Sequence, residues 1–208
     1  MNKLIIYAAD IGSVKKKNFG WARLEYGSHS DDITSDTCIK SFAQHIREDI
    51  SKRLRVSLGF ECPLFLDLPE DPIELTSARI GEGSRSWSAG AGLGALATGL
   101  TEVLWVLNEV RQRTETLITP TFSIAELNDG KANLLIWEAF VTSKAKGDSH
   151  TADAEIAVLE FANRMKFSRF STDVYVENPY SLVGAALLKS GITKEIGILS
   201  QQCLVIKA

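Results

Sequence analysis

The chain has 208 residues, of which 45% are hydrophobic, and a formal net charge of -3. This composition excludes a disordered chain and fits a single folded domain over residues 1–208. The net charge gives no general attraction to a polyanion, so any affinity for nucleic acid must come from local basic groups such as Lys144 and Lys146. The three cysteines are widely spaced, which indicates neither a disulfide framework nor a zinc site.

No segment is expected to span a membrane, because we find no apolar run of sufficient length. The first apolar run lacks the basic region and the cleavage site of a signal peptide, and Asp10 ends it early. We therefore expect a cytoplasmic protein.

The first strong pattern is an apolar run that starts after Lys3 and ends at Asp10, before a turn at Gly12. A run that is apolar on both faces predicts a central strand between two layers of helices. An acid at its carboxyl end would lie at the edge where open α/β sheets bind ligands, although aspartate also commonly begins a turn. Asp10 is therefore a candidate site residue if other carboxylates reach the same edge.

The next elements follow from the spacing of the apolar residues. Alternation over 19–26 predicts a strand antiparallel to the first, and 37–40 a weak third strand. An apolar residue at every fourth position then predicts a helix, which leads into a buried strand at 55–61 that ends in an acid. The glycine-rich segment near 79–94 predicts a loop inserted in the domain and shaped by a ligand.

The second half of the chain predicts further buried elements. We expect a helix at 96–110, a strand at 133–141 that contains Glu138, and a helix from His150 to Met165 with Asp148 or Ser149 as its N-cap. The segment 114–130 shows no clear pattern. The remaining elements are a short strand, a helix and a terminal apolar run, at 172–176, 180–189 and 203–206.

Three predicted strands carry acids, Asp10, Glu61 and Glu138, and the late helix carries His150 and Asp153 in its first turn. Positions three apart share a helical face, which here is otherwise apolar, so both side chains should point toward the sheet. Two carboxylates at about 4 Å repel by roughly 4 kcal/mol at an effective dielectric constant of 20. Bound cations or raised pKa values must relieve that repulsion.

An all-oxygen set of ligands suits Mg²⁺ or Mn²⁺ rather than Zn²⁺. We predict Asp10, Glu61, Asp153 and Glu138 as metal ligands, although strand alternation can also point Glu138 away from Asp10. His150 is a metal ligand or a proton-transfer group, or it only caps and packs the helix. Asp153 is also favoured by the helix dipole regardless of function, and Glu61 can simply stabilise the turn that follows it.

Three basic residues near the predicted site, Arg79, Arg85 and Lys144, are candidate contacts to a substrate phosphate. Arg79 and Arg85 can equally form structural salt bridges. Two divalent ions about 4 Å apart can hold the attacking water and the leaving oxygen of a phosphodiester, which needs no covalent nucleophile.

The order of these motifs resembles a known superfamily. The features are the strand acid Asp10, a strand that ends at Glu61 before Cys62-Pro63, and the helix start His150-Thr-Ala-Asp153. They look like the ribonuclease H-like fold, and within it the RuvC-type resolvases and a related family of predicted RuvC-like nucleases. The pattern Ser77-Ala-Arg79 and the acid Glu138 are similar to that family as well, although Glu61 stands where it has an aspartate.

This resemblance implies a three-layer α/β fold, with a mixed sheet, antiparallel first strands and helices on both faces. It also implies that Asp10, Glu61, His150 and Asp153 are catalytic and bind two Mg²⁺ or Mn²⁺ ions, that the substrate is DNA or RNA, and that the protein forms a homodimer. Two alternatives remain. One is a binding or scaffold protein that kept the fold and lost the chemistry. The other follows from Asp10-Ile-Gly12-Ser13, which also resembles the phosphate-binding turn of sugar kinases and actin-like ATPases.

Overall fold

A computed structural model describes residues 3–29, 32–83, 86–141 and 145–208. Within these ranges a seven-stranded mixed sheet has the order β3-β2-β1-β4-β7, and both β6 and β9 pair with the side of β7 that faces away from β4. The sheet strands are β1 (Leu4–Asp10), β2 (Gly20–Glu25), β3 (Thr34–Asp36), β4 (Arg55–Glu61), β6 (Pro120–Thr121), β7 (Leu134–Phe140) and β9 (Leu204–Lys207).

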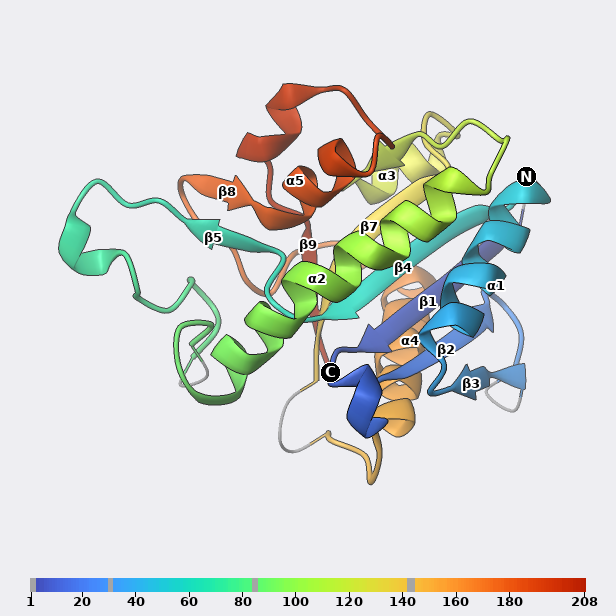
Figure 1. Ribbon diagram of the computed structural model, residues 1–208, viewed down its shortest axis with the longest axis horizontal. Coiled ribbons are helices and arrows are strands. Elements are labelled where there is room, and N and C mark those ends of the chain that lie inside the picture. The colour runs from blue at the N-terminus through green and yellow to red at the C-terminus, as the bar shows by residue number, and fades with distance from the viewer. Residues whose placement is uncertain (1–2, 30–31, 84–85, 142–144) are drawn as a thin grey trace.

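Helices cover both faces of this sheet (Figure 1). One face packs against α1, α2 and α5, and the other against α3 and α4. The helices are α1 (Ile39–Ser51), α2 (Gly90–Gln112), α3 (Ile124–Asn128), α4 (His150–Lys166) and α5 (Leu182–Lys189). A small second sheet pairs β5 (Phe65–Asp67) with β8 (Pro179–Ser181) beside the main one. The α/β class and the helices on both faces agree with the prediction from the sequence.

Strand β1 lies inside the sheet, between β2 and β4, and it is therefore buried along its whole length. Its side chains alternate between the two cores: Ile5 and Tyr7 pack under α1 and α2, and Leu4 and Ile6 pack under α4. It runs antiparallel to β2 and parallel to β4, which in turn runs parallel to β7. The carboxyl ends of β1, β4 and β7 therefore meet at one edge of the sheet.

Two of the short strands differ from the prediction. The third strand is Thr34–Asp36 rather than 37–40, because Cys38 is already the N-cap of α1. The segment 172–176 forms no strand in the described structure, and Tyr175 makes only an isolated bridge with Ile80. The segment without a clear pattern, 114–130, contains β6 and α3.

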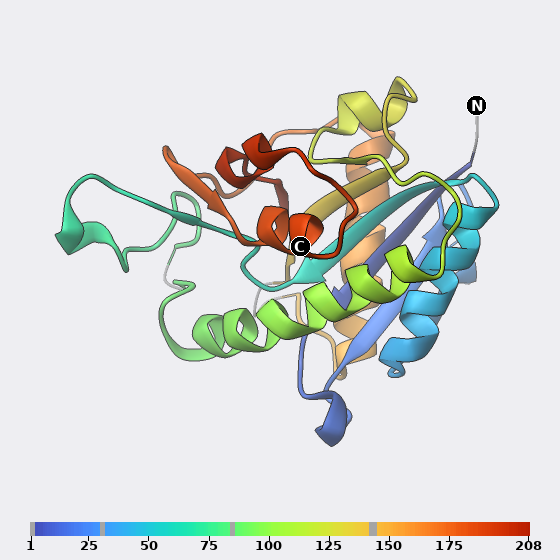
Figure 2. The ribbon, with the colours of Figure 1, turned by 45° about the horizontal axis from the view of Figure 1, so that its top comes forward.

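The predicted glycine-rich loop is shorter than expected, because α2 already begins at Gly90. In Figure 2, α2 is the long green helix. Glycine is a poor helix former, but tertiary packing overrides this preference here. A Cβ atom on Gly92 would lie 2.5 Å from the backbone oxygen of Ser86, so the missing side chain lets the preceding turn pack closely against the helix. Gly92 and Gly94 therefore lie inside the helix, and Gly90 begins it with a positive φ of 53°.

Helix α2 also corrects the expectation that no segment has the length of a membrane span. Among the described residues it is the one helix that is long and apolar enough, over Gly90–Gln112, although only 28% of its apolar window is buried in the protein. Its second half packs into the core through Val103, Val106 and Val110. A single helix of this kind is weak evidence for a membrane, because helices of soluble cores pass the same test.

Candidate metal centre

Three carboxylates meet at the carboxyl edge of the sheet. Asp10 ends β1, Glu61 ends β4, and the two are direct partners in the parallel register. Asp153 reaches them from the first turn of α4, and one oxygen from each of the three side chains lies within 4.8 Å of the others. Asp10 and Asp153 are buried and Glu61 is half-buried. The structure therefore brings together three of the four predicted acids, which we call the acidic triad.

A glycine allows α4 to approach this edge. Gly20 is the strand partner of Asp10 in β2, and a Cβ atom there would lie 2.3 Å from the backbone carbon of His150. Without a side chain at Gly20, the start of α4 packs directly on the backbone of β2. The Ser149 hydroxyl caps the helix by accepting from the amide of Ala152 at 3.1 Å. The sequence analysis missed Gly20, although a glycine in a strand interior often marks such a close approach.

The polar contacts of the triad come from the start of α4 and the loop before it. His150 Nδ1 forms a hydrogen bond with Asp10 Oδ2. The ammonium of Lys146 lies 3.3 Å from Asp153 Oδ2 and 3.7 Å from Glu61 Oε1. The backbone amide of Gly147 donates to Asp153 Oδ1 at 2.7 Å. Lys146 thus contacts two members of the triad, a role that the sequence analysis did not assign to it.

Burial dominates the ionisation of the triad. Burial, followed by the nearby Asp10 carboxylate, raises the pKa of Glu61 to about 8, and Lys146 opposes this rise. Burial likewise raises the pKa of Asp10, although its hydrogen bond with His150 opposes the change. Glu61 Oε2 is buried and has no hydrogen-bond partner within the described ranges. A buried acid with an unpaired oxygen is the kind of group that a cation would stabilise.

A cleft of about 710 Å³ opens beside the triad. Asp10, Glu61 and His150 line it, together with Trp87 and the small residues of the first turns of α2. The Trp87 indole donates to the backbone oxygen of Ser77 at 3.0 Å, which fixes the orientation of the ring. The cleft therefore connects the triad with an aromatic and largely apolar surface.

The fourth predicted metal ligand, Glu138, does not join the triad. In the parallel register it is the partner of Phe60, so it points to the α2 side of the sheet, whereas Asp10 and Glu61 point to the α4 side. Its Oε1 accepts from Arg79 Nη2 at 2.6 Å, and its Oε2 accepts from the amide of Leu64 at 2.9 Å. Because side chains alternate along β7, Glu138 points away from the triad, and its assignment as a ligand in this site is wrong.

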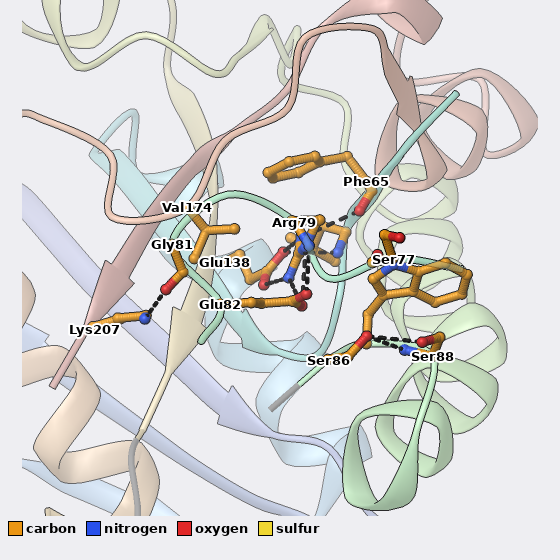
Figure 3. A network of polar contacts seen from close by, with 12 residues as sticks. Phe65, Ser77, Arg79, Gly81, Glu82, Ser86, Ser88, Glu138, Val174 and Lys207 are labelled. Atoms are coloured by element: carbon orange, nitrogen blue, oxygen red, sulfur yellow. Dashed lines mark hydrogen bonds and ion pairs between the residues drawn. The ribbon is translucent and has the colours of Figure 1, made fainter. Parts of the chain in front are cut away.

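Arg79 is also not placed to contact a substrate phosphate. Figure 3 shows its guanidinium between Glu82 and Glu138, and the side chains of all three are at most 1% exposed. It donates to Glu82 Oε1 at 2.9 Å and to the backbone oxygen of Phe65 at 3.2 Å. Arg79 therefore forms the structural salt bridge that the sequence left as an alternative. The other two candidate phosphate contacts, Arg85 and Lys144, lie outside the described residues.

Comparisons with protein-family models, with curated proteins and with solved structures found no match to this chain. The site is therefore interpreted from its geometry and chemistry.

Proposed function

We propose that this protein is a divalent-metal-dependent hydrolase of phosphodiester bonds, that is, a nuclease, built on a ribonuclease H-like fold. The observation that carries the proposal is the convergence of Asp10, Glu61 and Asp153, with one oxygen from each lying within 4.8 Å of the others. Three acids at this distance are costly to keep together, and the single ammonium of Lys146 can balance only one of their three charges.

The topology supports the ribonuclease H-like part of the proposal. The first three strands of the chain are antiparallel neighbours in the sheet, and β1, β4 and β7 are parallel neighbours. Helix α4, which supplies Asp153, follows β7 in the chain. The resemblance of the sequence to the superfamily rests on the same order of strands, acids and helix. The triad lies at the carboxyl ends of parallel strands, where open α/β sheets bind ligands.

The ligand atoms fit a hard cation. All three groups of the triad are carboxylates, and the unpaired Glu61 Oε2 offers a further oxygen. These features suit Mg²⁺ or Mn²⁺. Such ions polarise a phosphodiester and lower the pKa of a bound water, and the resemblance to RuvC-type enzymes leads us to expect two of them.

The residues of the chain supply positioning and proton transfer around the metal. Asp10, Glu61 and Asp153 would hold the cation at the edge of the sheet. His150 orients the Asp10 carboxylate through Nδ1, and its half-exposed ring borders the cleft, where it can exchange a proton with the substrate or with solvent. The cleft beside the triad is where the substrate strand would bind.

The test is cleavage of single-stranded, duplex and branched DNA and RNA in the presence of Mg²⁺ or Mn²⁺. The variants Asp10→Asn and Asp153→Asn should lose cleavage, because each removes a charged ligand. Asp129→Asn is the matched control, since Asp129 is an exposed acid on the loop that precedes β7, at the opposite edge of the sheet. Absence of cleavage by the wild type, together with no rise in melting temperature on addition of Mn²⁺, would refute the proposal and favour a binding protein without catalytic activity.

A further inference from the structure

The acidic triad already contains a cation, which is the side chain of Lys146. Its ammonium lies 3.3 Å from Asp153 Oδ2 and 3.7 Å from Glu61 Oε1, between acids that come from α4 and β4. A lysine side chain is positively charged at neutral pH. Its ammonium therefore adds a positive charge within the set of groups that would bind a metal.

The loop before α4, which contains Lys146 and Gly147, is held in place by its backbone and does not need the Lys146 ammonium. The Gly147 amide donates to Asp153 Oδ1, whereas Lys146 contacts the other oxygen, Oδ2. A Cβ atom on Gly147 would lie 2.5 Å from Cβ of Ala152, so this glycine lets the loop close against the first turn of α4. Asp153 can thus keep its hydrogen bond to the loop when Oδ2 changes its partner.

The side chain of Lys146 has room to move. It is 43% exposed and borders the cleft, whereas Asp153 and Asp10 are almost fully buried. A long and flexible side chain with its charged end near solvent can leave a carboxylate at a small cost in free energy. This arrangement differs from the buried guanidinium of Arg79, which has no exposed surface.

We propose that Lys146 is the internal cation of the metal-free site, and that a divalent ion binds by displacing its ammonium from Asp153 and Glu61. The inference rests on the proposed function, because it requires the triad to bind a metal. An ammonium and a metal ion that share the same carboxylates repel each other strongly at such distances. Lys146 therefore lowers the affinity of the site for metal, and after displacement its positive charge stays in the cleft that it borders.

The test measures the binding of Mn²⁺ to the full-length protein by calorimetric titration, without any substrate. Lys146→Met keeps the length of the side chain but removes its charge, and it should bind Mn²⁺ about tenfold more tightly than the wild type, which equals about 1.4 kcal/mol. Lys146→Arg keeps the charge and should bind with about the wild-type affinity. Lys131→Met is the control, because Lys131 forms an exposed pair with Asp129 at 3.1 Å at the opposite edge of the sheet. Lys146→Gln, a polar neutral variant, repeats the test should the methionine variant fold poorly.

The possible results separate this inference from the proposed function. Unchanged or weaker binding of Mn²⁺ by Lys146→Met and Lys146→Gln, with binding still lost in Asp153→Asn, would overturn the displacement and leave the metal site intact. Absence of Mn²⁺ binding in the wild type and in every lysine variant would overturn both. Tighter binding in the two neutral variants alone would support the displacement, whether or not the protein cleaves any of the nucleic acids tested.

Discussion

Replacement of Glu61 by glutamine should remove the pH dependence that this one carboxyl group gives to folding. The pKa of Glu61 rises from an ordinary value of 4.5 to about 8 in the folded protein, mainly because of burial. The folded state then holds this proton more tightly than the unfolded state, so the stabilisation is fully present below pH 4.5 and is lost as the pH rises through about 8. At about 1.36 kcal/mol for each pH unit, the upper limit of this loss is about 5 kcal/mol.

The measurement is the free energy of unfolding by urea for the metal-free protein, with a chelator present, at pH 5, 7 and 9. Glutamine keeps the shape of the side chain and cannot ionise, so Glu61→Gln should gain stability relative to the wild type as the pH rises, by several kcal/mol at pH 9 and within the upper limit of about 5 kcal/mol. Glu115→Gln is the control, because Glu115 is exposed on a loop. Parallel pH profiles for wild type and Glu61→Gln would show that Glu61 ionises normally in the folded protein, and the reasoning about its burial would fail.

Two further predictions concern residues that hold the site in place. Arg79→Met leaves Glu82 and Glu138 buried without their cation. It should therefore destabilise the protein by about 3–5 kcal/mol and lower its melting temperature by about 10 °C. Adding Glu82→Gln and Glu138→Gln to this variant should restore part of the lost stability. A fall of less than about 2 °C would show that the cluster is dispensable. Gly20→Ala places a Cβ atom against the backbone of His150 and should cost about 1–3 kcal/mol in urea unfolding, with weaker binding of Mn²⁺. Gly197→Ala is its control, since a Cβ there meets no atom within 4 Å, and equal stability of the two variants would contradict the close approach of α4.

The acidic triad could be predicted because its sequence signals are local. β1 and β4 are apolar runs that end in acids, and parallel strands bring their carboxyl ends to one edge. Asp153 lies three residues after His150 at the start of α4, on the helical face that packs against the sheet. These periodicities need no knowledge of distant contacts.

Glu138 could not be assigned in the same way, because it lies inside β7, whereas Asp10 and Glu61 are the last residues of their strands. A strand with apolar residues on both sides shows no alternation, so its sequence does not tell which face a given side chain joins. The pairing of Glu138 with Phe60 decides the matter, and that register depends on long-range contacts. The start of α2 was missed for a related reason, since contacts between Gly92 and the preceding turn outweigh the low helix propensity of glycine.

The acidic triad differs from the pair Glu82 and Glu138 in the position of its counter-charges. Glu82 and Glu138 share a guanidinium that has no exposed surface and satisfies both of them, which is the arrangement of a permanent structural ion pair. The triad has instead a half-exposed ammonium on a flexible stem, a half-exposed histidine, and a buried oxygen of Glu61 that has no partner within the described ranges. Acids that are only loosely neutralised, by a cation near solvent, can exchange that cation, whereas acids paired with the fully buried guanidinium of Arg79 cannot. This difference in neutralisation, more than the number of acids, supports the assignment of the metal centre to Asp10, Glu61 and Asp153.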